Sequence, residues 1–147
     1  MILPASPQKT VLITGAAGGI GVGLVEALAE AGWSVLGSDH PSVSPPKGLL
    51  QRCQAWVPAD LGALSRDRHP LETLRSSVLS AVGNDELMAV VHNAAVQRLG
   101  SFEQLGLGDW QETLDMNLMA PVAIRRALLP QLQRPRGSIV RLGRIHR

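Results

Sequence analysis

Tyrosine is missing from this 147-residue sequence, and cysteine and aromatic residues are scarce: it contains one Cys, one Phe and three Trp. A single cysteine, Cys53, excludes an intramolecular disulfide framework and fits a reducing compartment. The more ordinary interpretation of Cys53 is a small buried hydrophobic residue. The four His have no metal-ligand spacing with one another or with Cys53, so we expect no metal site.

Long hydrophobic runs are also missing, although 45% of the residues are hydrophobic. The apolar stretches are too short to span a bilayer, and residues 1–9 have neither the basic start nor the apolar core of a signal peptide. We therefore expect a cytoplasmic protein without a membrane partner. The length suits one domain over residues 1–147, with residues 1–9 as a disordered or extended lead and residues 141–147 as a basic tail.

Acidic residues are confined to the first part of the chain. Residues 1–115 contain all 12 Asp and Glu against 7 Lys and Arg, a balance of −5, whereas residues 116–147 contain 7 Arg, a balance of +7. Basic segments of this kind contact nucleic acid or anionic membranes in some proteins. No nucleic-acid motif or interleaved aromatic residue accompanies these arginines. We therefore favour a solvated helix face and a basic tail, with no nucleic-acid partner.

The stretch from residue 10 to residue 31 organises the rest of the chain. Residues 10–13 form a short apolar, β-branched run of the kind found in strands that are buried in a parallel sheet. A glycine-rich turn follows. The apolar residues after it recur at helical spacing: Ile20, Leu24, Leu28 and Ala31. The pattern predicts a strand, a tight turn and a helix, which is the first half of a βαβ unit.

Glycines suit this junction because a backbone without Cβ can adopt positive φ and allows a pyrophosphate to approach its N–H groups. The helix N-terminus offers further unpaired N–H groups to the same phosphate. The spacing Thr14-Gly15-x-x-x-Gly19-x-Gly21 resembles the cofactor loop of the short-chain dehydrogenase/reductase family. The alternative is an ordinary connection between a strand and a helix. The loop residues expected to bind a dinucleotide are Gly15, Ala17, Gly18, Gly19, Ile20 and Gly21.

Asp39 closes the predicted second strand, residues 33–38, and lies 18 positions after Gly21. An acid at this place in a Rossmann unit accepts hydrogen bonds from the adenosine ribose hydroxyls. A 2′-phosphate about 4 Å from the carboxylate would cost about 4 kcal/mol per charge pair at an effective dielectric constant of about 20. No Arg at positions 16–18 or 40 offsets this repulsion. We therefore expect NAD rather than NADP; the alternative for Asp39 is a turn residue before Pro41.

Two downstream segments extend the resemblance. Asp60-Leu61, after a predicted third strand at residues 55–57, resembles the Asp-aliphatic pair with which the family contacts adenine. Asn93-Ala94-Ala95, after a predicted fourth strand at residues 87–91, resembles the family's Asn-Ala-Gly segment, which implies contact with the nicotinamide ribose. Ala95 replaces the family's Gly and adds a methyl group there.

Asn117 lies in a predicted long helix over residues 109–133, in a segment that resembles the family's Asn-Leu-x-x-Pro signature. Pro121 has no N–H and therefore frees the carbonyl of Asn117. The resemblance implies that this carbonyl holds a water in the proton relay to the catalytic Lys. The alternative is an Asn in a proline-kinked surface helix.

The resemblance ends after the predicted fifth strand, residues 137–140. The family continues with a Ser and then a Tyr-x-x-x-Lys, in which Tyr moves the proton and Lys lowers its pKa. This sequence has no Tyr, and Arg144 stands where the Ser is expected. We therefore interpret the chain as the NAD(H)-binding portion of a short-chain dehydrogenase/reductase oxidoreductase that is inactive alone. The alternatives are a non-enzymatic NAD(H)-binding interaction module and a frameshifted or truncated fragment of a full-length dehydrogenase.

The expected fold is a Rossmann-type, doubly wound α/β domain with a parallel sheet of order 3-2-1-4-5, truncated before the usual sixth strand. The helix starting at Pro70 serves as scaffold. Strand five would have an unpaired edge over residues 138–142, and the long helix would expose apolar surface. We therefore expect a homo-oligomer or a heteromer. The candidates for the exposed helix surface are Leu114, Leu118, Val122, Leu128 and Leu132.

Overall fold

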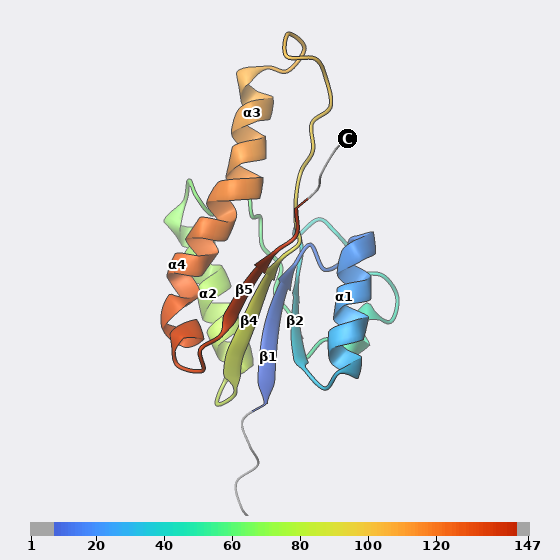
Figure 1. Ribbon diagram of the computed structural model, residues 1–147, viewed down its shortest axis with the longest axis vertical. Coiled ribbons are helices and arrows are strands. Elements are labelled where there is room, and N and C mark those ends of the chain that lie inside the picture. Colours follow the sequence, from blue (N-terminus) through green and yellow to red (C-terminus); the bar gives the residue numbers. More distant parts are fainter. Residues whose placement is uncertain (1–7, 144–147) are drawn as a thin grey trace, which may run out of the picture.

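A computed structural model describes residues 8–143 and contains a five-stranded parallel sheet. The strand order is β3-β2-β1-β4-β5, which confirms the predicted order. The strands are β1 (Lys9–Thr14), β2 (Ser34–Ser38), β3 (Ala55–Trp56), β4 (Glu86–His92) and β5 (Ser138–Arg141). All four pairings are parallel, so the carboxyl ends of the strands meet at one edge of the sheet. Figure 1 shows the sheet with helices on both sides.

Two layers of apolar side chains separate the sheet from its helices. On one face, Val11, Ile13 and Val35 pack with α1 (Gly19–Glu30) and the short 3₁₀ helix η1 (Leu49–Arg52). On the other face, Leu12 and Val90 pack with α2 (Arg68–Val82) and α4 (Ala120–Gln133). Adjacent residues of β1 thus face opposite layers, as the period of a strand requires.

The glycine-rich turn joins β1 to α1, as predicted, but the buried face of α1 differs from the prediction. Gly21 and Val25 are the buried residues of this helix. Ile20 is 66% exposed and Ala31 is exposed, so neither belongs to the core stripe. The reason is the close contact at Gly21, where an added Cβ would lie 2.0 Å from the carbonyl oxygen of Gly15. This contact turns Gly21 inward and leaves Ile20 on the side facing away from the core.

Helix α2 begins at Arg68, two residues before the predicted start at Pro70. Asp67 is its N-cap, and the Asp67 side chain accepts a hydrogen bond from the His69 N–H at 2.9 Å. A capping carboxylate of this kind satisfies one of the unpaired donors of the first turn. The buried residues of the helix are Leu74, Val78 and Val82.

The predicted long helix is present and starts slightly earlier, at α3 (Leu107–Leu114). It continues through a π-helical segment (Asp115–Met119) into α4 without a break. In this segment the Ala120 N–H donates to the Asp115 carbonyl, five residues back. Figure 1 shows α3 extending beyond the carboxyl ends of the strands; the loop over residues 97–106 leads up to its start.

The β5 edge of the sheet is open among the described residues. Strand β5 pairs with β4 alone, and all four of its residues are exposed. Leu114, Leu118 and Val122 are exposed as predicted. Leu128 and Leu132 are not: both are buried, because they lie on the face of α4 that packs against the sheet.

The predicted lead and tail fall largely outside residues 8–143. Within that range, Lys9 already belongs to β1, and Arg141 still belongs to β5. The Leu142 N–H also donates to the His92 carbonyl at 3.0 Å, extending the pairing by one residue. Arg144 lies outside the described residues. No helix in the described part of the chain is long and apolar enough to cross a membrane.

Candidate functional site

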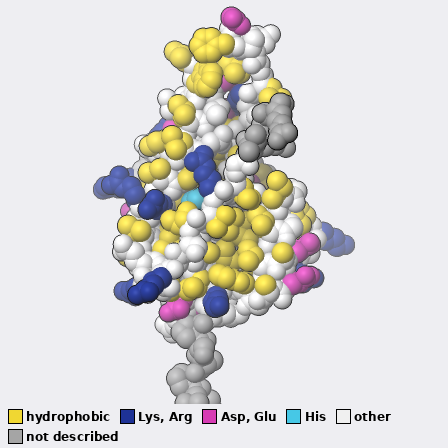
Figure 2. All heavy atoms as spheres, viewed as in Figure 1, with side chains coloured by type: hydrophobic (Ala, Val, Ile, Leu, Met, Phe, Trp, Pro, Cys, Tyr) yellow, Lys and Arg dark blue, Asp and Glu magenta, His cyan; other side chains and the backbone are white. Residues whose placement is uncertain are grey.

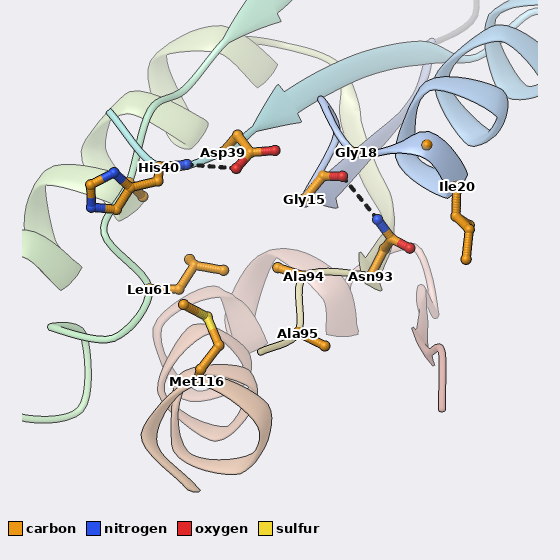
Figure 3. Close-up of a pocket in the computed structure, with 12 residues that line it drawn as sticks. Gly15, Gly18, Ile20, Asp39, His40, Leu61, Asn93, Ala94, Ala95 and Met116 are labelled. Carbon is orange, nitrogen blue, oxygen red and sulfur yellow. Dashed lines mark hydrogen bonds between the residues drawn. The ribbon is translucent and has the colours of Figure 1, made fainter. Parts of the chain in front are cut away.

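A cavity of about 490 Å³ opens at the carboxyl ends of β1, β2 and β4. Figure 3 shows Asp39 and His40 on one side of it, Ile20 near the start of α1, and Leu61 and Met116 opposite. Nine residues predicted to bind a cofactor line this cavity: Gly15, Gly18, Gly19, Ile20, Asp39, Leu61, Asn93, Ala94 and Ala95. Three others, Ala17, Gly21 and Asp60, lie beside it without lining it.

The glycine-rich turn forms one wall of the cavity. Gly15 has φ +65°, and an added Cβ would lie 2.8 Å from the Ala94 Cα, so this position requires glycine. The Gly18 N–H donates to the Gly15 carbonyl at 3.2 Å and closes the turn. Helix α1 starts at Gly19 without a side-chain cap. No side chain of the described residues caps the N–H groups of Gly19, Ile20 and Gly21, which lie at or beside the cavity.

Asp39 fixes the turn to the end of β2. One carboxylate oxygen accepts from the Ala17 N–H at 3.0 Å, and the other accepts from the His40 N–H at 2.8 Å. The side chain is half-buried and lines the cavity. A carboxylate has about four lone-pair sites, so these two bonds leave acceptor capacity for a further hydroxyl group.

His40 extends this wall beyond Asp39. Its ring lies 3.8 Å from the Asp60 carboxylate and 2.7 Å from the Ser42 hydroxyl. Asp60 is exposed, whereas the neighbouring Leu61 is buried and presents its side chain to the cavity. The apolar member of the Asp-Leu pair therefore lines the cavity, whereas the acidic member lies outside it, near the ring of His40.

The segment after β4 forms the opposite wall. Asn93 donates from Nδ2 to the Gly15 carbonyl at 2.9 Å, as the dashed line in Figure 3 shows. The Thr14 hydroxyl accepts from the Ala94 N–H at 3.2 Å. These two bonds join the ends of β1 and β4 and hold the backbone of the wall close to the turn. Ala95 is exposed, and its methyl group lies at the cavity.

Asn117 lies at a second, adjoining cavity of about 670 Å³. Its side chain forms two bonds with Val96, accepting from the N–H at 2.9 Å and donating to the carbonyl at 2.8 Å. Its own carbonyl, which Pro121 leaves without a helical donor, accepts a hydrogen bond from the Arg141 guanidinium. A side chain of β5 therefore occupies the carbonyl that the family resemblance assigns to a water.

His92, at the end of β4, also lines the second cavity. The residue is only 4% exposed, and its Nε2 has no hydrogen-bond partner within residues 8–143. Burial, which is the larger cause, and the nearby charge of Arg141 together lower the pKa of His92 to about 4. The imidazole is therefore neutral at pH 7.

Asp115 anchors the π-helical segment to the loop before α2. It is 3% exposed and accepts from Arg66 Nε at 2.6 Å and from the Ser65 hydroxyl at 3.1 Å. The hydrogen bond from Arg66 lowers the pKa of Asp115, outweighing the opposing effect of burial. The ion pair thus fixes the segment that carries both Met116 and Asn117.

Several lining residues of the two cavities are not among the predicted site residues, and those with functional side chains include His40, His92, Met116 and Arg141. His92 directly follows the predicted fourth strand and His40 lies two residues after the predicted second strand, and these positions are a signal that sequence reasoning can use. Met116 and Arg141 give no such signal in the sequence, because only the folding of the chain brings them to the cavities. No group of His, Cys, Asp and Glu that could hold a metal ion occurs in the described part of the chain.

The fold and the glycine-rich turn define a Rossmann-type α/β domain. The family model described as short chain dehydrogenase matches residues 9–144, so the chain belongs to the short-chain dehydrogenase family. A ketoacyl reductase of Nostoc is 30% identical over 92% of this chain and 47% of its own length.

Solved structures agree with this assignment. A short-chain dehydrogenase from Streptomyces avermitilis has a TM-score of 0.77 and 27% identity, over 91% of this chain and 48% of its own. An oxidoreductase of the family from Brucella ovis, solved with a partially ordered NAD, has a TM-score of 0.73 and 24% identity; the match covers 90% of this chain and 61% of its own. The chain thus spans about half the length of the curated relatives it matches.

Proposed function

We propose that this chain binds NAD(H) in the first cavity, as the cofactor portion of a short-chain dehydrogenase/reductase oxidoreductase. The observation that carries the proposal is the glycine-rich turn, where only a backbone without Cβ fits at Gly15 and the uncapped N-terminus of α1 lies beside the cavity. Unpaired N–H groups and the positive end of a helix dipole favour a pyrophosphate there. The family membership and the NAD held by the Brucella relative support the same cofactor.

The remaining cavity residues fit the other parts of the dinucleotide. Asp39 has free acceptor capacity for ribose hydroxyls, and Leu61 provides an apolar surface for adenine. Asn93, Ala94 and Ala95 would border the nicotinamide ribose. The cofactor, when bound, would supply the hydride chemistry, and these residues would bind and orient it.

Asp39 would select NAD over NADP, because a 2′-phosphate beside its carboxylate brings two like charges together. The experiment is calorimetric titration of wild type, Asp39→Ala and Asp39→Asn with NAD⁺ and NADP⁺. Asn can still accept from Ala17, so Asp39→Asn separates the charge from the hydrogen bond that holds the turn. Glu30→Ala, at the exposed far end of α1, is the control.

We expect wild type to prefer NAD⁺ and both Asp39 variants to lose most of that preference. Equal affinity of wild type for the two dinucleotides would refute the role of Asp39. Failure of wild type to bind either one would refute the proposed cofactor site.

The chemical step would require residues outside this sequence, which contains no Tyr. Asn117, the relay position by family resemblance, has its carbonyl bonded to Arg141. We therefore propose that the chain is inactive alone. A non-enzymatic NAD(H)-binding interaction module is the second candidate, and the open β5 edge favours it because an unpaired strand edge can dock a partner.

The partner in either case would be a second copy of this chain or another chain covering β5 and α4. Figure 2 shows hydrophobic side chains gathered in the middle of this face. The exposed apolar residues of β5 and α4 include Val122, Ile139 and Val140, and Leu118 is exposed in the π-helical segment before α4. The single cysteine supports the cytoplasm as the proposed location.

A further inference from the structure

The second cavity has an unusual balance of charge. Among its described lining residues are two arginines, Arg98 and Arg141, and no Asp or Glu. Arg98 donates from Nε to Glu112 at 2.9 Å, so a carboxylate outside the lining neutralises its charge. Arg141 forms no ion pair within residues 8–143. Among residues 8–143, the lining of this cavity therefore carries one positive charge without an ion-pair partner.

The guanidinium of Arg141 is held in place rather than left free. It comes from the last residue of β5 and donates to the Asn117 carbonyl, so it bridges the sheet edge and the π-helical segment. That bond uses one of its N–H groups. The remaining N–H groups have no partner in the described part of the chain, although a guanidinium is suited to bind a carboxylate through two parallel bonds.

His92 provides a second, independent observation. Its Nε2 is buried without a hydrogen-bond partner among the described residues, and His92 lines the same cavity as Arg141. Buried polar atoms in folded proteins are nearly always bonded, so an orphaned ring nitrogen at a cavity marks a place for a ligand or an ordered water. Because the imidazole is neutral, it would add a hydrogen bond rather than a second charge.

The position of this cavity connects it to the proposed cofactor site. Four residues line both cavities: Ile20, Asn93, Ala94 and Ala95. A molecule in the second cavity would therefore lie next to the part of the first cavity that we assign to the nicotinamide ribose. If NAD(H) binds the first cavity as proposed, a compound in the second cavity would lie beside its nicotinamide end.

We propose that the second cavity is a carboxylate site, in which Arg141 and His92 recognise the acid group of a small oxo acid or hydroxy acid. This inference rests on the proposed function, because it names the substrate class of the same oxidoreductase site. Arg141 binds the carboxylate, His92 contributes a hydrogen bond, and the rest of the molecule extends toward the wall shared with the first cavity.

The test is calorimetric titration of the 147-residue chain with acetoacetate and with methyl acetoacetate, its neutral ester, with and without NAD⁺. We expect the acid to bind about tenfold or more tightly than the ester, because a hydrogen bond to a charged group contributes about 1.5–3 kcal/mol and about 1.4 kcal/mol is a factor of ten. Arg141→Gln should remove this preference, and Arg141→Lys should retain part of it. Arg126→Gln, at an exposed residue of α4 outside the cavity, should leave it unchanged.

Two further readouts separate binding from folding. Thermal melting of each variant shows whether it is folded, and acetoacetate should shift the ring NMR signals of His92 in wild type at pH 7. Equal binding of acid and ester would overturn the proposal, as would undiminished binding of the acid by folded Arg141→Gln. If the chain binds NAD⁺ but does not bind acetoacetate, the carboxylate site alone is refuted. If the chain binds acetoacetate but does not bind NAD⁺, the carboxylate site is supported and the proposed cofactor is refuted.

Discussion

The two adjoining cavities differ in how they are built. The first is formed mainly by backbone and short side chains, and its key contacts join Gly15, Asn93 and Asp39. The second is also lined by long side chains, including those of Arg98 and Arg141, and Arg141 donates to the Asn117 carbonyl. The residues that resemble the family's cofactor motif thus gather at the first cavity, whereas at the second cavity Arg141 occupies the Asn117 carbonyl that the resemblance assigns to a water.

The largest expected effect concerns turnover. Removing one acid/base group typically lowers a rate by about 10² to 10⁴, and this sequence has no Tyr to serve as the family's proton donor. We expect no change in absorbance of NADH with acetoacetate or a panel of neutral ketones. Heat-labile turnover by the pure chain would contradict this prediction, because it would show that the second cavity is catalytically complete.

The next prediction tests how strictly the first cavity depends on its backbone. Gly21→Ala should destabilise the fold by about 3 kcal/mol or more, because the added Cβ would lie 2.0 Å from the Gly15 carbonyl oxygen. Gly23→Ala is the matched control: it lies in the same helix, nothing lies within 4 Å of its Cβ position, and it should stabilise by about 0.5–1 kcal/mol. Urea unfolding of the two variants measures both effects. Equal stability would mean that the turn adapts easily.

Much of the first cavity could be predicted from the sequence because its constraints are steric and local. A positive φ at Gly15 and a close contact at Gly21 leave only glycine, so the spacing of glycines carries the geometry. The strand order also followed from the pattern. Ile20, which the sequence assigns to the cofactor site, lines both cavities; helical periodicity alone does not show that its side chain is exposed.

The second cavity could not be predicted in the same way. Arg141 meets Asn117 only because β5 pairs with β4 and the π-helical segment lies beside the strand ends. Nothing in the spacing of these residues indicates that contact. The same holds for the ion pair of Arg66 with Asp115, which joins two segments 49 residues apart.

A third prediction concerns the pH dependence of stability that buried His92 causes at the second cavity. Its pKa is about 4 in the fold and about 6.5 in the unfolded chain, so the unfolded state binds the proton more readily between these values. His92 contributes about 3 kcal/mol in total to the free energy of unfolding through this pKa difference. The contribution is fully present above pH 6.5 and is lost as the pH falls toward 4. Urea unfolding of wild type and His92→Asn from pH 7 to pH 4.5 measures the difference.

Wild type should lose more stability than His92→Asn over that range. Arg141→Gln should retain most of the wild-type slope, because burial is the larger cause of the lowered pKa and the charge of Arg141 is the smaller. Parallel curves for wild type and His92→Asn would mean that water or an anion already reaches the ring. In that case the second cavity would be more open than the buried Nε2 indicates.

The smallest expected effect on stability concerns the open edge beside both cavities. Ile139 on β5 is 40% exposed, and Ile139→Lys should change the free energy of unfolding by less than about 0.5 kcal/mol. The same substitution should shift light scattering at micromolar concentration toward the monomer, because a charged residue on an edge strand opposes pairing with another chain. Ser76→Lys, on an exposed face of α2 away from β5, adds the same charge and should leave the assembly unchanged. If wild type scatters as a 15.6 kDa monomer of ordinary thermal stability, the exposed edge does not drive self-association, and a different chain becomes the expected partner of β5 and α4.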